Sequence, residues 1–279
     1  MLTIREAVTV DDLHAQADDL DDEAVHRSLS LLEELHARVL SLIASRPDVG
    51  ASDLLPLKRE IERLMGQFAV RLGATVMGYQ QQAFDLSDEL VDLQLTRAGI
   101  SLGIVGISDA VLRVAQAYVP SQITDITTTA ASKIGREIQL AALGGRSYTE
   151  LTKAIGANLD GPSVFGTLAV RTEVITRTET AKVRALGYQQ RGNQAAELLP
   201  GLKKVWRHAP QMTGGGKKGT YQPRPAHVAL HGRTIAWEEQ FSVNGYPANG
   251  PHDPNLPAKE VVNCKCRLVL DVSGTEYAT

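Results

Sequence analysis

Apolar residues recur at spacings of three and four along the first part of this 279-residue chain. The repeat covers residues 25–42 and resumes over residues 54–68, with Pro47 and Gly50 between the two stretches. This spacing places the apolar side chains on one face of an α-helix, and proline followed by glycine ends a helix. The sequence therefore predicts two amphipathic helices that form either an antiparallel hairpin or a seam for self-association.

Helical spacing continues, less regularly, beyond this pair. Residues 109–119 form an amphipathic pattern that Pro120 is expected to end. A second helical face covers residues 123–138 and stops at Gly144. The stretch 100–108 before them is interrupted by glycines, so a loop and a short strand both remain open there.

Residues 147–193 carry clear signals for the start and the end of helices. Ser147 and Glu150 fit the capping box, in which each side chain bonds to the backbone N–H of the other residue. Ser163 follows a proline and opens the next helix, which is predicted to end at Gly192-Asn193.

Composition and charge exclude several classes of protein. With 43% hydrophobic residues and two cysteines, the chain is neither disordered throughout nor a disulfide scaffold. We expect no membrane span, since no apolar run is long enough to cross a bilayer. We also expect no secretory signal, since residues 1–10 lack a basic region followed by an apolar stretch. Residues 11–23 hold seven acids and no Lys or Arg, which indicates a solvated helix start or a mobile acidic arm. Residues 201–279 carry a net charge of +4 and the rest −7, which is too little to indicate a nucleic-acid binder by itself.

The pattern changes after Pro200-Gly201, where glycine and proline become frequent and helical spacing is lost. Short strands are predicted at residues 203–208, 233–237 and 266–272, and one or two helical turns at residues 224–230. The predicted fold class is a mainly α N-terminal and central region with a small C-terminal α+β module. We divide the chain into three parts. Residues 1–140 form a helical body that could dock a partner, residues 141–200 form a second helical part, and residues 201–279 form the C-terminal module.

Two enzyme motifs fail in the C-terminal module. The glycine-rich segment at residues 214–219 resembles a phosphate loop, but Gly219 follows Lys218 where that loop needs Ser or Thr to hold magnesium. His227 and His231 have the spacing of a zinc protease, but Val228 stands where the general-base glutamate would be.

A cluster of potential metal ligands nevertheless remains. His227, His231, Cys264 and Cys266 could supply a tetrahedral zinc site, and His252 belongs to the same cluster. Cys264 and Cys266 are too close in sequence for a disulfide between them, and their use favours synthesis in a reducing compartment. Two alternatives stay open: the side chains could only bond to irregular backbone, or one cysteine could act with His227 as a reactive thiol.

The ordered set of residues in this module resembles the phage Mu F-like head morphogenesis (minor head protein) family. The resemblance covers about residues 145–270, including a helix with an R-T-E segment. The chain lacks a Cys-x-x-Cys that many members carry near Arg224, and Lys265 replaces the usual arginine of the N-C-R-C segment. The motif residues of this chain are Arg177, Glu179, Trp206, Arg224, His227, Gly232, Asp253, Glu260, Asn263, Cys264 and Cys266.

The resemblance implies a low-copy, non-enzymatic protein of the bacteriophage virion, at the capsid interior or the portal vertex. Its implied partner is the portal protein, together with capsid or scaffolding proteins, and its role is in procapsid assembly and DNA packaging or delivery. No cofactor is expected, although zinc could bind at the cluster. Within the motif, Arg177 or Glu179 could pair with Glu260 or Arg267 if the helix packs on the module.

Two alternative functions belong to other classes. The module could be a metal- or thiol-dependent enzyme, because Mu F-like modules are fused to toxin domains in some chains. The protein could also be a DNA-binding accessory component of the virion, in which Lys217 and Lys218 contact DNA or a partner.

Overall fold

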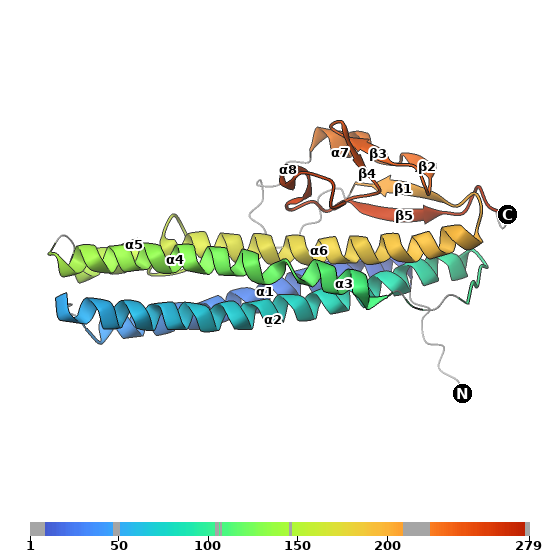
Figure 1. Cartoon of the computed structure of the whole chain (residues 1–279). Helices are drawn as coiled ribbons and strands as arrows, with labels where there is room; N and C mark the ends of the chain where they lie inside the picture. The colour runs from blue at the N-terminus through green and yellow to red at the C-terminus, as the bar shows by residue number, and fades with distance from the viewer. Residues whose placement is uncertain are drawn as a thin grey trace. The chain divides into compact units, whose positions relative to one another are not determined.

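The computed structural model describes residues 9–46, 51–103, 106, 108–144, 147–208 and 224–276 (Figure 1). These residues form two compact units, and each unit combines separate segments of the chain. One unit comprises residues 23–78 and 116–177, and the other comprises residues 9–22, 79–115 and 178–276 with the gaps just given. The mainly helical fold with a small C-terminal α+β module is the predicted fold class. The division at residues 140 and 200 stays a prediction.

The unit of residues 23–78 and 116–177 is a bundle of helices. Its members are α4 (Val119–Ala142), α5 (Tyr148–Ile155) and parts of α1 (Val10–Ala44), α2 (Ala51–Arg97) and α6 (Val164–Leu198). Its core is almost entirely aliphatic, as the composition requires. Fully buried members include Leu32, Val39, Ile43, Leu57, Ile61, Leu72, Val76, Ile123, Ile134 and Ile138.

Within this bundle, α1 and α2 form the predicted hairpin. Apolar residues of both helices belong to one core, and the two helices lie side by side in Figure 1. Arg71 of α2 also donates to Glu34 of α1 across 2.7 Å, on the exposed side of the pair. The helices are longer than predicted, because α1 includes the whole acidic segment 11–23 and α2 continues to Arg97.

Local signals set several helix boundaries as predicted. The Ser147 hydroxyl accepts from the Glu150 N–H and the Glu150 carboxylate accepts from the Ser147 N–H, so the capping box is confirmed at α5. The Ser163 hydroxyl likewise accepts from the Gly166 N–H at the start of α6. Pro120 is a correction, because it lies in the first turn of α4, where its missing N–H costs no hydrogen bond.

The second unit holds α3 (Asp109–Gln116, up to Ala115), the remaining parts of α1, α2 and α6, and the C-terminal module. Salt bridges join its helices. Arg184 of α6 makes two bonds of 2.9 and 2.8 Å to the buried carboxylate of Asp21 in α1. Arg191 of α6 pairs with Asp88 and Asp92 of α2. Nearly all of the arginine side-chain surface is buried, so these pairs hold the helices in one register.

The C-terminal module contains two small antiparallel sheets. Strands β1 (Lys203–Arg207), β2 (Thr234–Ala236) and β5 (Arg267–Asp271) form the first sheet, in the order β2-β1-β5. These strands confirm the three predicted segments. Strands β3 (Phe241–Val243) and β4 (Tyr246–Ala248) form a hairpin that the sequence analysis did not predict.

Two short helices complete the module, α7 (Pro225–Ala229) and α8 (Ala258–Val261). α7 lies within the predicted helical turns at residues 224–230, whereas α8 was not predicted. A buried cluster that includes Trp206, Phe241, Val243 and Val261 forms the core of the module.

The module packs against the C-terminal part of α6 (Figure 1). The Tyr188 hydroxyl donates to the Gln94 side chain and accepts from the Leu270 N–H, both at 2.9 Å, and so ties α6 to α2 and β5. Burial is the main cause that raises the pKa of Tyr188, so the phenol stays protonated as this bonding requires.

The predicted end of α6 at Gly192-Asn193 is wrong, because the helix continues to Leu198. Both residues instead serve the contact with Trp237 of the module. A Cβ atom on Gly192 would lie 2.0 Å from a carbon of the indole ring, and the Asn193 side chain accepts from the indole N–H at 2.8 Å. Glycine therefore provides space for an aromatic ring in the middle of this helix rather than ending it.

Within the described ranges, none of the helices combines the length and the apolar character that crossing a membrane requires.

Lys204 of β1 is an unusual feature of the module core. Its side chain is fully buried, its ammonium lies 5.4 Å from the Trp237 ring centre, and its Nζ makes no hydrogen bond to the described residues. Burial lowers the pKa of Lys204 to about 8.

Replacing Lys204 by methionine is therefore expected to stabilise the protein by about 1 kcal/mol at pH 7, because a buried charge without a hydrogen bond is removed. Between about pH 8 and pH 10.5, unfolded Lys204 keeps the proton that folded Lys204 has lost, so raising the pH stabilises the wild type. The advantage of the variant should shrink across that window in urea unfolding at several pH values. If the free energies of unfolding of the variant and the wild type differ by the same amount at every pH, the low pKa of Lys204 is contradicted.

Candidate metal centre

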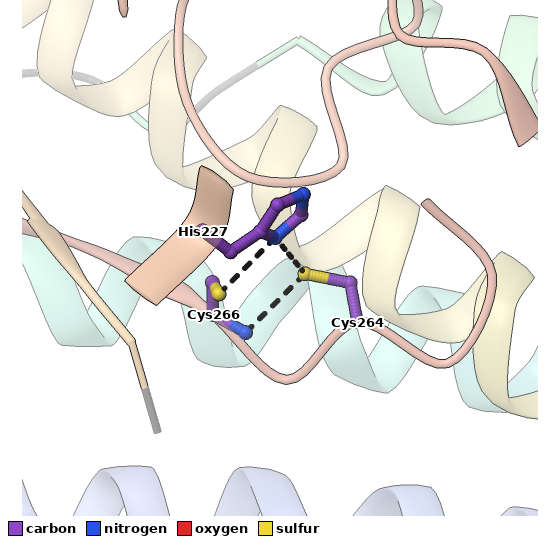
Figure 2. Close-up of side chains that lie close together, drawn as sticks. All are labelled: His227, Cys264 and Cys266. Atoms are coloured by element: carbon purple, nitrogen blue, oxygen red, sulfur yellow. Dashed lines mark hydrogen bonds between the residues drawn. The ribbon is translucent and has the colours of Figure 1, made fainter. Parts of the chain in front are cut away.

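Three side chains from the predicted cluster meet in the C-terminal module: His227, Cys264 and Cys266 (Figure 2). His227 lies on α7, Cys264 follows α8, and Cys266 directly precedes β5. All three are buried, with exposed fractions of 2%, 6% and 4%. Residues nearly forty positions apart in the chain therefore converge on one point.

The Nδ1 atom of His227 lies between the two sulfurs. It is 3.5 Å from the Sγ atom of Cys264 and 3.5 Å from that of Cys266. The Cys266 backbone N–H also points to the Cys264 sulfur at 3.4 Å. The three ligand atoms lie within 4.8 Å of one another, so they are close enough to hold one metal ion.

The loops around these residues are fixed by motif side chains. The Arg224 guanidinium donates to the Val262 carbonyl oxygen at 2.6 Å, which ties the start of α7 to the segment that carries both cysteines. Asn263 has a φ of 54°, and asparagine tolerates this left-handed conformation better than most residues. The turn that it makes leads directly to Cys264.

A carboxylate orients the imidazole from the opposite side. The Nε2 atom of His227 lies 3.1 Å from Glu260 Oε2, and the Asn244 side chain donates to Glu260 Oε1 at 2.8 Å. Burial disfavours the charge on Glu260, but the bonds from Asn244 and His227 outweigh it and lower the pKa of this carboxyl. A carboxylate at Nε2 favours the tautomer with a proton there, which leaves the Nδ1 lone pair facing the sulfurs.

The two thiols titrate as a pair. A hydrogen bond from Cys266 holds the pKa of Cys264 well below its ordinary value, with further help from His252 and His227. The same bond, together with burial, raises the pKa of Cys266. The arrangement therefore favours one thiolate at Cys264, and thiolate is the form of cysteine that binds metals.

Two further histidines lie beside the sulfurs. The Nδ1 atom of His208 is 3.6 Å from the Cys266 sulfur, a neighbour that the sequence analysis did not predict. His252 interacts electrostatically with Cys264, but it is not among the three residues whose ligand atoms lie within 4.8 Å of one another. It is 4% exposed, and its Nδ1 makes no hydrogen bond to the described residues. The sequence analysis grouped His252 with this cluster without choosing it as a ligand.

His231 does not join the three cluster residues. Its side chain is exposed, and its Nδ1 accepts the His208 backbone N–H at 3.2 Å. The expectation that His231 shares a helical face with His227 is wrong because α7 ends at Ala229.

The other motif residues of the module have structural contacts. Gly232 has a φ of 77° and donates its N–H to the Trp206 carbonyl at 2.8 Å. The fully buried Trp206 ring packs edge-on against His227, with ring centres 5.4 Å apart. The Asp253 carboxylate accepts from the N–H groups of Asn249 and Asn255, and so closes the loop before α8.

Ion pairs of the R-T-E segment lie within α6. Glu179 is buried and pairs with Lys182 at 2.7 Å, and Arg177 pairs with Glu173 at 3.7 Å. Glu260 faces His227 as described, and Arg267 pairs with Asp18. A pairing of Arg177 or Glu179 with Glu260 or Arg267 stays a prediction. Lys217 and Lys218 lie outside the described residues.

The arrangement suits some kinds of chemistry better than others. Because the imidazole and both thiols are buried, a substrate could reach them only if the module opened. The same burial, with an oriented imidazole beside one thiolate and one thiol, suits a bound metal ion or a static hydrogen-bonded core.

Comparisons with known proteins give two short matches. The chain is 28% identical over 144 residues to the NAD(+)–arginine ADP-ribosyltransferase EFV of Enterococcus faecalis, which covers 52% of this chain and 26% of that protein. It is 41% identical over 68 residues to the uncharacterized protein YqbB of Bacillus subtilis, which covers 24% of this chain and 20% of that protein. The matches thus span about a quarter and a fifth of these relatives. No family model and no solved structure matches the chain.

Proposed function

We propose that this protein is a non-enzymatic head morphogenesis protein of a tailed bacteriophage or prophage, a minor virion component that binds the portal protein. The observation that carries the proposal is that five motif residues of the C-terminal module, which resemble the Mu F-like pattern, converge around one buried cluster. Arg224, His227, Glu260, Cys264 and Cys266 are separated in the sequence, yet they contact one another or the same short loop.

The contacts of these residues favour a scaffold over an active site. Arg224 bonds to backbone, Glu260 orients an imidazole, and Asp253 closes a loop. Each of these three side chains is held by a contact within the module, as a structural motif needs. A catalytic cysteine has to be accessible to its substrate, and Cys264 and Cys266 are only 6% and 4% exposed.

The short matches agree with a module that occurs in different protein contexts. A shared segment that makes up a quarter of a larger enzyme is what a Mu F-like module fused to a toxin domain would give. On this view the transferase activity resides in the remaining three quarters of that protein, and this chain carries the module with its own helical body.

The helical body of residues 1–140 is the part that we assign to docking on the portal, with capsid or scaffolding proteins as further partners. The site of action is then the capsid interior or the portal vertex, during procapsid assembly and DNA packaging or delivery. DNA contact through Lys217 and Lys218 is a separate prediction. If it is right, the affinity of the protein for DNA should fall steeply as the salt concentration rises.

Co-expression with the portal protein of the same phage tests the proposal. A tag on this chain should retain the portal oligomer, and the portal protein of an unrelated phage serves as the control. The double variant Lys217→Ser/Lys218→Ser should retain the portal equally well, because those residues are assigned to DNA. A portal that elutes without this chain at every salt concentration would contradict the proposal.

An enzymatic assay distinguishes the proposed non-enzymatic role from the main alternative, a metal- or thiol-dependent enzyme. Incubated with NAD⁺ and an arginine-rich acceptor protein, the purified chain should transfer no ADP-ribose and release no nicotinamide. Transfer that is lost in Cys264→Ser or His227→Gln would instead make this module an enzyme and overturn the non-enzymatic part of the proposal.

A further inference from the structure

We propose that the C-terminal module binds one zinc ion through His227 Nδ1, Cys264 Sγ and Cys266 Sγ, that the His252 side chain turns toward the ion as the fourth ligand, and that the ion stabilises the fold. This inference goes beyond the proposed function and does not depend on it, since a closed zinc site would hold the module together whatever its partner is.

The distances among the first three ligands fit tetrahedral zinc. With zinc–sulfur bonds of about 2.3 Å and zinc–nitrogen bonds of about 2.0–2.1 Å, sulfur and nitrogen lie about 3.5 Å apart across a tetrahedral angle. The two observed sulfur–nitrogen distances at His227 are both 3.5 Å. A shared metal ion accounts for both distances. Hydrogen bonds between the imidazole and the thiols would give similar distances, and the metal analysis below separates the two explanations.

Glu260, which lies at the Nε2 atom of His227, is placed like the carboxylates that support zinc-binding histidines without binding the ion themselves. Histidines that bind zinc commonly donate their other N–H to a carboxylate, which fixes the tautomer and strengthens the ligand. Glu260 occupies this place at 3.1 Å, is itself buried, and is held by Asn244. Asn244 lies in the β3–β4 turn, so this chain of bonds links the hairpin to the cluster.

His252 is the residue whose state most needs explaining. It is 4% exposed, its Nδ1 makes no hydrogen bond to the described residues, and its φ is 62°. A left-handed backbone at a residue other than glycine and a buried nitrogen without a partner each cost about 1 kcal/mol or more. His252 interacts electrostatically with Cys264, and its ring lies outside the group of three atoms within 4.8 Å of one another, so it has to turn to reach the ion. Coordination would then give the buried nitrogen a partner.

The ligand set also identifies the type of site. Two thiolates neutralise the charge of Zn²⁺, so the ion can be buried without a further counter-charge. Four protein ligands leave no open position for water or substrate, which is the arrangement of structural zinc rather than catalytic zinc. Paired thiolate and imidazole ligands favour zinc over magnesium or calcium, which prefer oxygen.

Metal analysis of the purified full-length chain tests the site directly. We expect one zinc per chain by elemental mass spectrometry. After removal with a chelator, titration with Co²⁺ should give the intense visible bands of tetrahedral cobalt and an ultraviolet thiolate-to-cobalt band. Glu260→Gln should keep these bands and weaken zinc affinity about 10–100-fold, because it changes only the outer partner.

Variants at the four histidines assign the ligands. His227→Gln and His252→Gln should each weaken zinc binding more than Glu260→Gln does and change the cobalt spectrum. His231→Gln is the matched control, since its ring is exposed, and His208→Gln should keep the tetrahedral bands as well. If His208→Gln loses the bands while His252→Gln keeps them, the assignment of the fourth ligand is wrong.

The cysteine variants test the inference as a whole. Cys264→Ser and Cys266→Ser should each reduce the thiolate-to-cobalt band and lower the zinc content. The chelator-treated wild type controls for misfolding, because it retains every side chain and should recover zinc on titration. A wild-type chain that is purified without zinc and gives no tetrahedral cobalt spectrum overturns the proposal.

Discussion

Replacing Arg184 by methionine is expected to destabilise the protein by about 3–5 kcal/mol. The guanidinium makes two bonds of 2.9 and 2.8 Å to the Asp21 carboxylate and a third, of 3.2 Å, to the Ala17 carbonyl oxygen. The side chains are only 17% and 9% exposed, so methionine would leave a buried carboxylate without its counter-charge. Removing one partner of a buried pair is far more costly than removing the pair.

Two controls make this prediction specific. Arg71→Met breaks a pair of similar length with Glu34, but both of those side chains are about half exposed, so a loss below about 1 kcal/mol is expected. The double variant Arg184→Met/Asp21→Leu should recover much of the stability lost in the single variant. Urea unfolding followed by circular dichroism provides the comparison. Equal losses for Arg184→Met and Arg71→Met would contradict the role assigned to burial.

Gly192→Ala is expected to destabilise the protein by about 2–3 kcal/mol, although alanine favours helices by about 1 kcal/mol over glycine. The added Cβ would lie 2.0 and 2.1 Å from two carbons of the Trp237 ring, which is buried. The ring cannot shift without weakening its 2.8 Å bond to Asn193, so α6 and the module would have to separate slightly.

Gly66→Ala provides the matched control for Gly192→Ala. Gly66 lies in α2, is exposed, and has no atom within 4 Å of the place where its Cβ would lie. The substitution should therefore stabilise the protein by about 0.5–1 kcal/mol. Opposite signs for the two variants in thermal and urea unfolding are the expected result. Stabilisation in both would mean that Trp237 does not pack on α6 as described.

Much of the helical fold could be predicted because its signals are local. Apolar spacing identified the first two helices, and Ser147 with Glu150 marked the start of α5. The predicted helix end at Gly192-Asn193 was wrong because glycine and asparagine can either end a helix or make room for, and bond to, a side chain that is distant in the sequence. Trp237, which lies 45 positions later, decides between these outcomes, and nothing near Gly192 in the sequence reveals it.

The unpredicted β3–β4 hairpin did have a local signal. Asn244-Gly245 lies between two apolar-containing segments, and both residues have positive φ, at 50° and 83°. Asn-Gly is the preferred pair for a two-residue hairpin turn, so this element could have been found from the sequence.

The candidate site was partly predictable. Residue type alone selected His227, Cys264 and Cys266, because cysteine and histidine that gather in a glycine-rich module favour metal binding. The choice between His231 and His252 needed the fold. Spacing favoured His231, but α7 is too short to carry it, whereas His252 is buried and interacts electrostatically with Cys264. The roles of Glu260 and Asn244 depend on long-range contacts that no local pattern encodes.

On this proposal the motif side chains close around a metal ion and so form a structural core. A crystal structure of the full-length chain, with diffraction data collected on both sides of the zinc absorption edge, would locate such an ion. We expect one anomalous peak within bonding distance of His227 Nδ1, both cysteine sulfurs and the His252 ring. Cysteines without such a peak, or facing an open cleft with His227, would contradict it.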